Sequence, residues 1–105
     1  MKYEVIITLR AEQEGQANYD WWAENRSQEQ AARWYDEFLN AALSLENNPD
    51  RFPLAAERSR FPYEIRQLNF GLGGKRTHRL VYTIRRNEVV VLCVRHLAQD
   101  AIGID

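Results

Sequence analysis

YEIRQLNFG at 63–71, KRTHRLVYTI at 75–84 and NEVVVLCVRHLAQ at 87–99 are the three extended runs that decide the fold of this chain. All three are rich in β-branched and aromatic residues, which is typical of strands. Short connections join the runs, so neighbouring strands should pair in antiparallel hairpins. The sequence therefore predicts strands at 63–70, 76–85 and 88–96, with a loop at 71–75 and a tight turn at Arg86 and Asn87.

Charge is divided unevenly between the two halves of the chain. Residues 58–96 include nine basic and two acidic residues, whereas residues 1–57 include five basic and eleven acidic ones. The last nine residues add two negative charges, and the net charge of the whole chain is −1. An asymmetry of this kind indicates an anionic partner for the basic half. The alternative is that the two halves neutralise each other across the fold.

Length and composition narrow the class of protein. A chain of 105 residues supports one core, so we expect a single domain over residues 1–105. The single cysteine, Cys93, excludes an internal disulfide and a cysteine-based metal cluster. The apolar run at 5–7 is too short for a signal peptide, and no segment reaches membrane-spanning length. We therefore expect a cytoplasmic protein that makes no membrane contact.

The N-terminal half predicts one strand followed by two helices. Residues 2–8 (KYEVIIT) alternate as a short strand does, and the Ala-, Glu- and Gln-rich segment 9–25 predicts a helix. Ser27 and Gln30 form a capping-box pattern that opens a second helix, which Pro49 ends. One stripe of this helix is apolar at a spacing of 3.6 residues and comprises Ala31, Trp34, Tyr35, Phe38, Ala42 and Leu45.

The predicted fold class is α+β in the order β-α-α-β-β-β. A twisted antiparallel sheet should carry the N-terminal helical hairpin on one face. The apolar side of the strand at 76–85 should meet the helices, which directs Arg79 and Arg85 to the other face. That second face is expected to stay open, and residues 50–62 are expected to form a connector.

This order of fragments resembles the RelE/ParE superfamily of bacterial type II toxin–antitoxin toxins, also called plasmid-stabilisation toxins. The resemblance covers nearly the whole chain, and its order and spacing are more specific than any single fragment. It implies a cognate antitoxin as partner, a toxin–antitoxin hetero-oligomer, and no cofactor. The fragments that carry it are LENNP at 45–49, IRQL at 65–68, HRLVYTI at 78–84, and VVVLCVRH at 89–96 followed by Gln99 and Asp100.

The superfamily includes two mechanisms, and a third reading remains beside them. RelE-like members are ribosome-dependent mRNA endonucleases, whereas ParE-like members inhibit DNA gyrase and are not nucleases. The chain has only two lysines and a pI near 6.1, which disfavours binding to the ribosome. The ending Val94-Arg95-His96 also resembles ParE-like members, so gyrase is the favoured target over ribosome-bound mRNA. The third reading is a non-toxic, degenerate member that acts only as a binding module.

If the chain is RelE-like, the resemblance implies that His96, Arg79, Arg66 and Tyr82 are catalytic. His96 would be the general base, because its unperturbed pKa of ~6.5 lies near operating pH. Arg66 and Arg79 would meet on neighbouring strands and hold the phosphate. The structural alternatives are arginines paired with acids such as Glu64 or Asp100, a tyrosine in the core, and a structural histidine.

Five basic residues are the expected contacts to the target or its phosphates: Lys75, Arg76, Arg79, Arg85 and Arg95. No metal site is expected, because His78 and His96 lie eighteen positions apart with no carboxylate or thiol pattern beside them. The glycines at 71–74 predict a hairpin loop and not a phosphate-binding loop. The tryptophans at 21, 22 and 34 should pack the helical hairpin, and any that stays exposed would offer a site for a partner helix.

Overall fold

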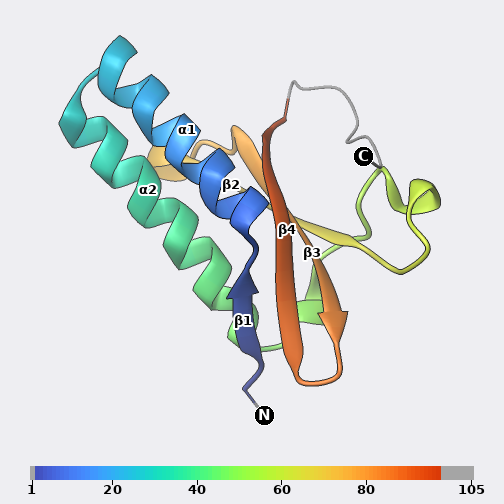
Figure 1. Cartoon of the computed structure of the whole chain (residues 1–105). Coiled ribbons are helices and arrows are strands. Elements are labelled where there is room, and N and C mark those ends of the chain that lie inside the picture. Colours follow the sequence, from blue (N-terminus) through green and yellow to red (C-terminus); the bar gives the residue numbers. More distant parts are fainter. Residues whose placement is uncertain (1, 98–105) are drawn as a thin grey trace.

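The computed structural model describes residues 2–97 and confirms the predicted fold class (Figure 1). A helical hairpin lies on one face of a four-stranded sheet in this part of the chain. Four short 3₁₀ helices lie in the connecting segments: η1 (Ser44–Glu46), η2 (Pro49–Arg51), η3 (Arg58–Arg60) and η4 (Leu72–Gly74). The main elements are β1 (Glu4–Ile7), α1 (Leu9–Asn25), α2 (Gln28–Leu43), β2 (Arg66–Phe70), β3 (His78–Arg85) and β4 (Glu88–His96).

The sheet has the strand order β1-β4-β3-β2. β2, β3 and β4 pair antiparallel as predicted, but β1 pairs parallel to β4, with Val5 opposite Val89. The prediction of a wholly antiparallel sheet is therefore wrong for β1. The chain reverses at four successive connections after α1, so β4 runs in the direction of β1. Parallel strands need a long crossover, and here α1, α2, β2 and β3 all lie in the chain between β1 and β4.

The main core lies between the hairpin and the sheet. Of the predicted apolar stripe, Trp34, Phe38 and Ala42 of α2 and Leu45 of η1 are buried there and Tyr35 is half-buried; the Trp34 and Phe38 rings stack with centroids 5.8 Å apart. Gly15 of α1 packs against the Phe38 ring, because a Cβ at this position would lie 2.6 Å from a ring carbon. The predicted cap of α2 is confirmed, since Ser27 Oγ accepts the Gln30 N–H at 3.1 Å. From the sheet, this core receives Leu80, Tyr82, Val89 and Val91.

The second face of the sheet is covered, which corrects the prediction of an open face. Residues 47–65 are here called the connector: it starts beside the main core, against which Phe52 packs, and its later part lies on the side away from the helices (Figure 1). Ala55 and Ile65 of the connector are fully buried against Val81 and Cys93. β4 is apolar on both of its faces, so each face needs a covering layer. Because the connector extends to residue 65, β2 begins at Arg66, later than the predicted residue 63.

Candidate functional site

Arg79 is buried beneath the connector, although the sequence predicted that it would face an open surface. Its side chain forms a two-pronged ion pair with Glu57, in which Nη1 donates to Oε1 at 2.8 Å and Nη2 donates to Oε2. Gln67 Oε1 accepts a further hydrogen bond from Nη1 at 3.2 Å. The bond to Glu57 raises the pKa of Arg79, so the guanidinium stays charged. An arginine that forms two hydrogen bonds to a carboxylate is well suited to a low-dielectric interior.

Arg66 lies on the opposite face of the sheet from Arg79, so the predicted meeting of the two arginines is wrong. The register places Arg66 opposite Tyr82, and Asn69 opposite Arg79. Arg66 Nη1 donates to the carbonyl of Phe52 at 2.6 Å, and Nη2 bonds Glu64 Oε1 at 2.9 Å. Glu64 is one of the acids proposed as a structural partner. The other, Asp100, lies outside the described residues.

Tyr82 has no exposed area. Its hydroxyl donates to the carbonyl of Pro49 at 2.5 Å, and burial raises the pKa of the phenol to about 12. A side chain in this position packs the core and holds the start of the connector. It has no surface with which to contact a nucleic acid in this structure.

Arg66, Tyr82 and Arg79 thus have one role in common. Each reaches from the sheet to a different point of the connector: the carbonyl of Phe52, the carbonyl of Pro49 and the carboxylate of Glu57. These bonds fix a segment that is otherwise short of regular structure. Three of the four residues proposed as catalytic in a RelE-like enzyme therefore hold the connector in place.

His96, the fourth, lies at the exposed end of β4 opposite His78, with the two ring centroids 5.0 Å apart. His78 is buried; its Nδ1 accepts the indole N–H of Trp34 at 3.3 Å and lies 2.8 Å from Thr77 Oγ1. The proton of a neutral ring must then reside on Nε2, which donates to Asn18 Oδ1 at 3.0 Å. Burial and the neighbouring His96 lower the pKa of His78 to about 4.

A cavity of about 600 Å³ opens between the second half of α1 and the ends of β3 and β4. His78 and His96 are both among its lining residues. Trp21 and Trp22 meet edge to face with centroids 5.5 Å apart, and Trp21 remains 49% exposed. The lining side chains are Glu14, Ala17, Asn18, Trp21, Trp22, Thr77, His78, Val94, Arg95 and His96.

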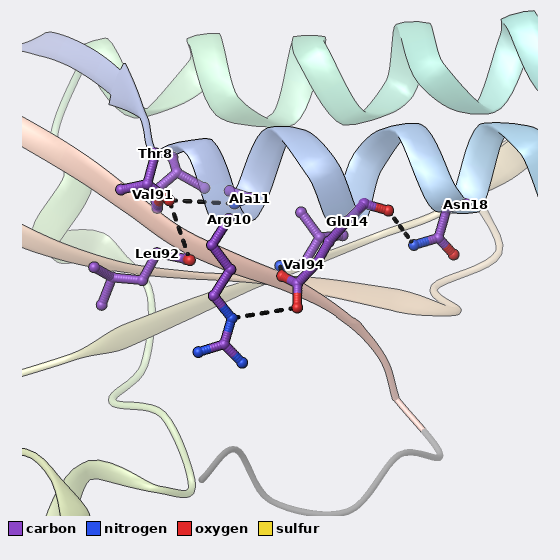
Figure 2. Close-up of polar contacts among 8 residues, drawn as sticks. All are labelled: Thr8, Arg10, Ala11, Glu14, Asn18, Val91, Leu92 and Val94. Carbon is purple, nitrogen blue, oxygen red and sulfur yellow. Dashed lines mark hydrogen bonds and ion pairs between the residues drawn. The ribbon is translucent and has the colours of Figure 1, made fainter. Parts of the chain in front are cut away.

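Polar contacts join β1, α1 and β4 beside this cavity, which Glu14 and Val94 line (Figure 2). Thr8 caps α1 by accepting the Ala11 N–H, and its hydroxyl donates to the Val91 carbonyl at 2.8 Å. One turn further on, Glu14 Oε1 accepts the backbone N–H of Val94 at 2.9 Å. Beyond the end of β1, the side chains of Thr8 and Glu14 therefore form hydrogen bonds to the backbone of β4.

A family model for the ParE toxin of the type II toxin–antitoxin system parDE matches residues 5–101. The chain belongs to the ParE toxin family. A solved structure described as the chromosomal ParDE TA system from P. aeruginosa matches with a TM-score of 0.71 and 16% identity, over 90% of this chain and 96% of that chain. At this identity the match shows the shared fold. No curated protein matches the sequence. The predicted resemblance and its ParE-like branch are confirmed.

In this ParE toxin the five expected basic contacts do not form one cluster. Lys75 and Arg76 are exposed beside η4, and Arg76 lines a smaller hollow of about 340 Å³ against α2. Arg85 is exposed at the far end of β3, opposite Glu88. Arg95 lies opposite the buried Arg79 in the same row of the sheet, and it lines the large cavity.

Two acids with important positions in the ParE fold were missed from the sequence. Glu57 pairs with Arg79, and it is the only acidic residue between residues 51 and 63, which was an available signal. Glu14 bonds Val94 across eighty positions, and no local pattern indicates that contact. Within residues 2–97, no group of three or more His, Cys, Asp or Glu side chains is placed to hold a metal ion. None of the helices in that range is both long and apolar enough to cross a bilayer.

Proposed function

We propose that this type II toxin inhibits bacterial growth by acting on DNA gyrase and that a cognate antitoxin neutralises it in a hetero-oligomer. The main observation in support of this proposal is the buried Arg79–Glu57 pair. An endoribonuclease needs cations on the scissile phosphate and groups that move protons. Here Arg79, Arg66 and Tyr82 are engaged with the connector, which supports the ParE-like mechanism over RNA cleavage.

Charge supports the same choice of target. A ribosome-directed nuclease benefits from many exposed cations, since affinity for a phosphate-rich particle grows with their number. This chain has a pI near 6.1, and Arg10, Arg66 and Arg79, among its twelve arginines, are paired with acids within the described residues. Lys75, Arg76, Arg85 and Arg95 remain the proposed contacts to the target. Both gyrase and ribosomes are cytoplasmic, so the cytoplasm is the proposed place of action.

The deciding experiment compares two reactions with one purified sample. The protein should block gyrase supercoiling or trap cleaved DNA, and it should leave mRNA on programmed ribosomes intact. His96→Ala is the informative variant, because it should retain inhibition of supercoiling. The RelE-like alternative predicts cleavage in the ribosomal A site that His96→Ala slows by at least ~100-fold, the low end for loss of a positioned acid–base group. Such cleavage would overturn the gyrase proposal.

A growth assay separates both toxin mechanisms from the non-toxic binding module. Induced expression of the chain alone should arrest growth, and co-expression of the product of the adjacent short reading frame should restore it. The two proteins should also co-elute in size-exclusion chromatography. Unimpaired growth together with co-elution would identify the binding module instead.

A further inference from the structure

Two arginines of the connector, Arg58 and Arg60, are exposed at η3 and were not among the expected basic contacts. They begin the basic half of the chain, in which residues 58–96 include nine basic and two acidic residues. Arg58 Nη1 donates to the carbonyl of Ala55 at 3.3 Å, and neither guanidinium forms an ion pair within residues 2–97. Exposed cations of this kind attract an anionic partner.

The acids closest to these arginines in the sequence are bound to other side chains. Glu57 is buried with its carboxylate on Arg79, and Glu64 pairs with Arg66. They are the only two acids of the segment 51–66, so this segment has no further carboxylate to balance the arginines of η3. Because Glu57 points into the fold, the surface of the connector is more basic than its sequence suggests.

The backbone that carries the two arginines is held in place by hydrogen bonds. The Arg58 N–H donates to the Ala55 carbonyl at 3.1 Å, and the Arg60 N–H donates to the Glu57 carbonyl at 2.8 Å. The Glu57 side chain is fixed in turn by its ion pair with Arg79 of β3. A ligand that binds here therefore has little main chain to order, which lowers the entropic cost of binding.

Tyr63 adds an exposed aromatic ring beside the arginines. Its ring is 40% exposed and meets the Phe61 ring edge to face, with centroids 5.8 Å apart. Phe61 packs against the apolar cluster beneath the connector, so it supports the tyrosine ring from the inner side. The Tyr63 hydroxyl can donate a hydrogen bond. Guanidinium and tyrosine hydroxyl groups are among the donors that proteins use on DNA phosphates.

We propose that Arg58, Arg60 and Tyr63 contact the phosphate backbone of duplex DNA. The inference rests on the proposed target for its setting, since gyrase holds the DNA on which it acts, and it adds a direct contact of the toxin to that DNA. The contact lies on the side of the sheet away from the helical hairpin (Figure 1). Phosphate contacts position a protein without reading the bases, so duplexes of unrelated sequence should bind equally.

The first test compares two double variants that lose the same charge. Arg58→Gln/Arg60→Gln removes the contact, and Arg26→Gln/Arg33→Gln is the matched control, because Arg26 and Arg33 are exposed arginines of the helical hairpin. A thermal melt checks that both variants fold. Fluorescence anisotropy with a short duplex at low ionic strength measures affinity against salt concentration. The log–log slope should fall by about 2 in the connector variant, since each lost phosphate contact removes roughly 0.9, and the control should keep the wild-type slope.

The same variants also test the contact in the presence of gyrase. Half-inhibition of supercoiling should need at least ~10-fold more of the connector variant than of the wild type, as expected for the loss of charge-assisted hydrogen bonds. The control variant should inhibit as the wild type does.

Cross-linking identifies the class of molecule that lies at η3. Arg60→Cys can be labelled with a photoreactive maleimide, and Cys93 is buried and so does not compete for the reagent. After illumination of the complex of toxin, gyrase and labelled DNA, the adduct should include DNA. Arg33→Cys, labelled in the same way, should give no DNA adduct. An adduct with a gyrase subunit alone would overturn the DNA contact and indicate a protein surface instead.

The outcomes separate this inference from the proposed function. Inhibition of supercoiling by the wild type, with equal potency and equal salt slopes in the two double variants, would overturn the DNA contact while the gyrase proposal stands. Salt-dependent duplex binding that only the connector variant loses, by a protein that leaves supercoiling unaffected, would overturn the gyrase proposal while the contact stands.

Discussion

Glu57 of the connector and Arg79 of β3 form a buried, two-pronged ion pair that holds the covering layer on the second face of the sheet. The side chain of Glu57 has no exposed area, and that of Arg79 is 7% exposed. The pair joins residues 22 positions apart on the face of the sheet where the smaller apolar cluster of Ala55, Ile65, Val81 and Cys93 lies. The stability of the connector therefore depends on this interaction more than on any helix or strand of its own.

Removal of one partner from this pair should be costly. Glu57→Gln leaves the Arg79 charge buried without its counter-ion, and we expect a loss of about 3 kcal/mol in the free energy of unfolding. Urea denaturation measures it. Glu64→Gln is the matched control, because Glu64 is 62% exposed in its pair with Arg66 and should contribute less than ~1 kcal/mol. Equal losses in the two variants would contradict a special role for Glu57.

Acid should destabilise the fold through His78. Burial and the neighbouring His96 lower its pKa from 6.5 to about 4, so the unfolded chain binds this proton more readily than the folded protein. The stability present above pH 6.5 is lost as pH falls towards 4, by about 3 kcal/mol from this group in total. Below that pH the contribution changes no further.

The difference in unfolding free energy between the wild type and His78→Gln, measured across this pH range, isolates the effect from the carboxylates. The gap between the two proteins should narrow as the solution is acidified. Parallel curves would show that His78 does not titrate as described.

Tyr82→Phe separates a structural tyrosine from a catalytic one. The variant loses the hydrogen bond to the Pro49 carbonyl and leaves that buried acceptor without this donor, at a cost of about 1–2 kcal/mol. Thermal unfolding measures the loss. Inhibition of gyrase by the folded variant should equal that of the wild type. A large loss of activity with unchanged stability would indicate that Tyr82 has a catalytic role after all.

Gly15→Ala should destabilise the protein although alanine is the better helix former. The gain in helix propensity is about 1 kcal/mol, whereas crowding against the Phe38 ring costs about 1–3 kcal/mol. Phe38→Leu should relieve the crowding, so the double variant should be more stable than the two separate effects imply. Differential scanning calorimetry of the four proteins completes the cycle. Additive effects would show that the ring does not confine Gly15.

Local patterns in the sequence predicted most of the helices and strands, but they predicted little of how the strands pair. The bounds of β4 at Glu88–His96 and the Ser27 cap of α2 follow from neighbouring residues, and both are observed as predicted. The parallel pairing of β1 with β4 depends on contacts more than eighty positions apart. Alternation with a period of two identifies a strand but does not give its direction or its neighbour.

The site was harder to predict for the same reason. Arg79 was expected on an open face because the segment 50–62 has no periodicity that predicts a covering layer. Arg66 and Arg79 were expected to meet, but the register of β2 against β3 places them on opposite faces. The cavity combines α1 with two strand ends that lie about sixty to eighty positions away, so its outline emerges only from the tertiary structure.

The position of β4 between β1 and β3 has a consequence for how this protein folds during its synthesis. β4 is an interior strand of the sheet and the last of the four described strands to be synthesised, so β1 has no partner strand until β4 is made. Contacts between distant parts of a sequence also form slowly. A chain that terminates before residue 88 lacks the strand that joins β1 to β3, so it cannot form the four-stranded sheet.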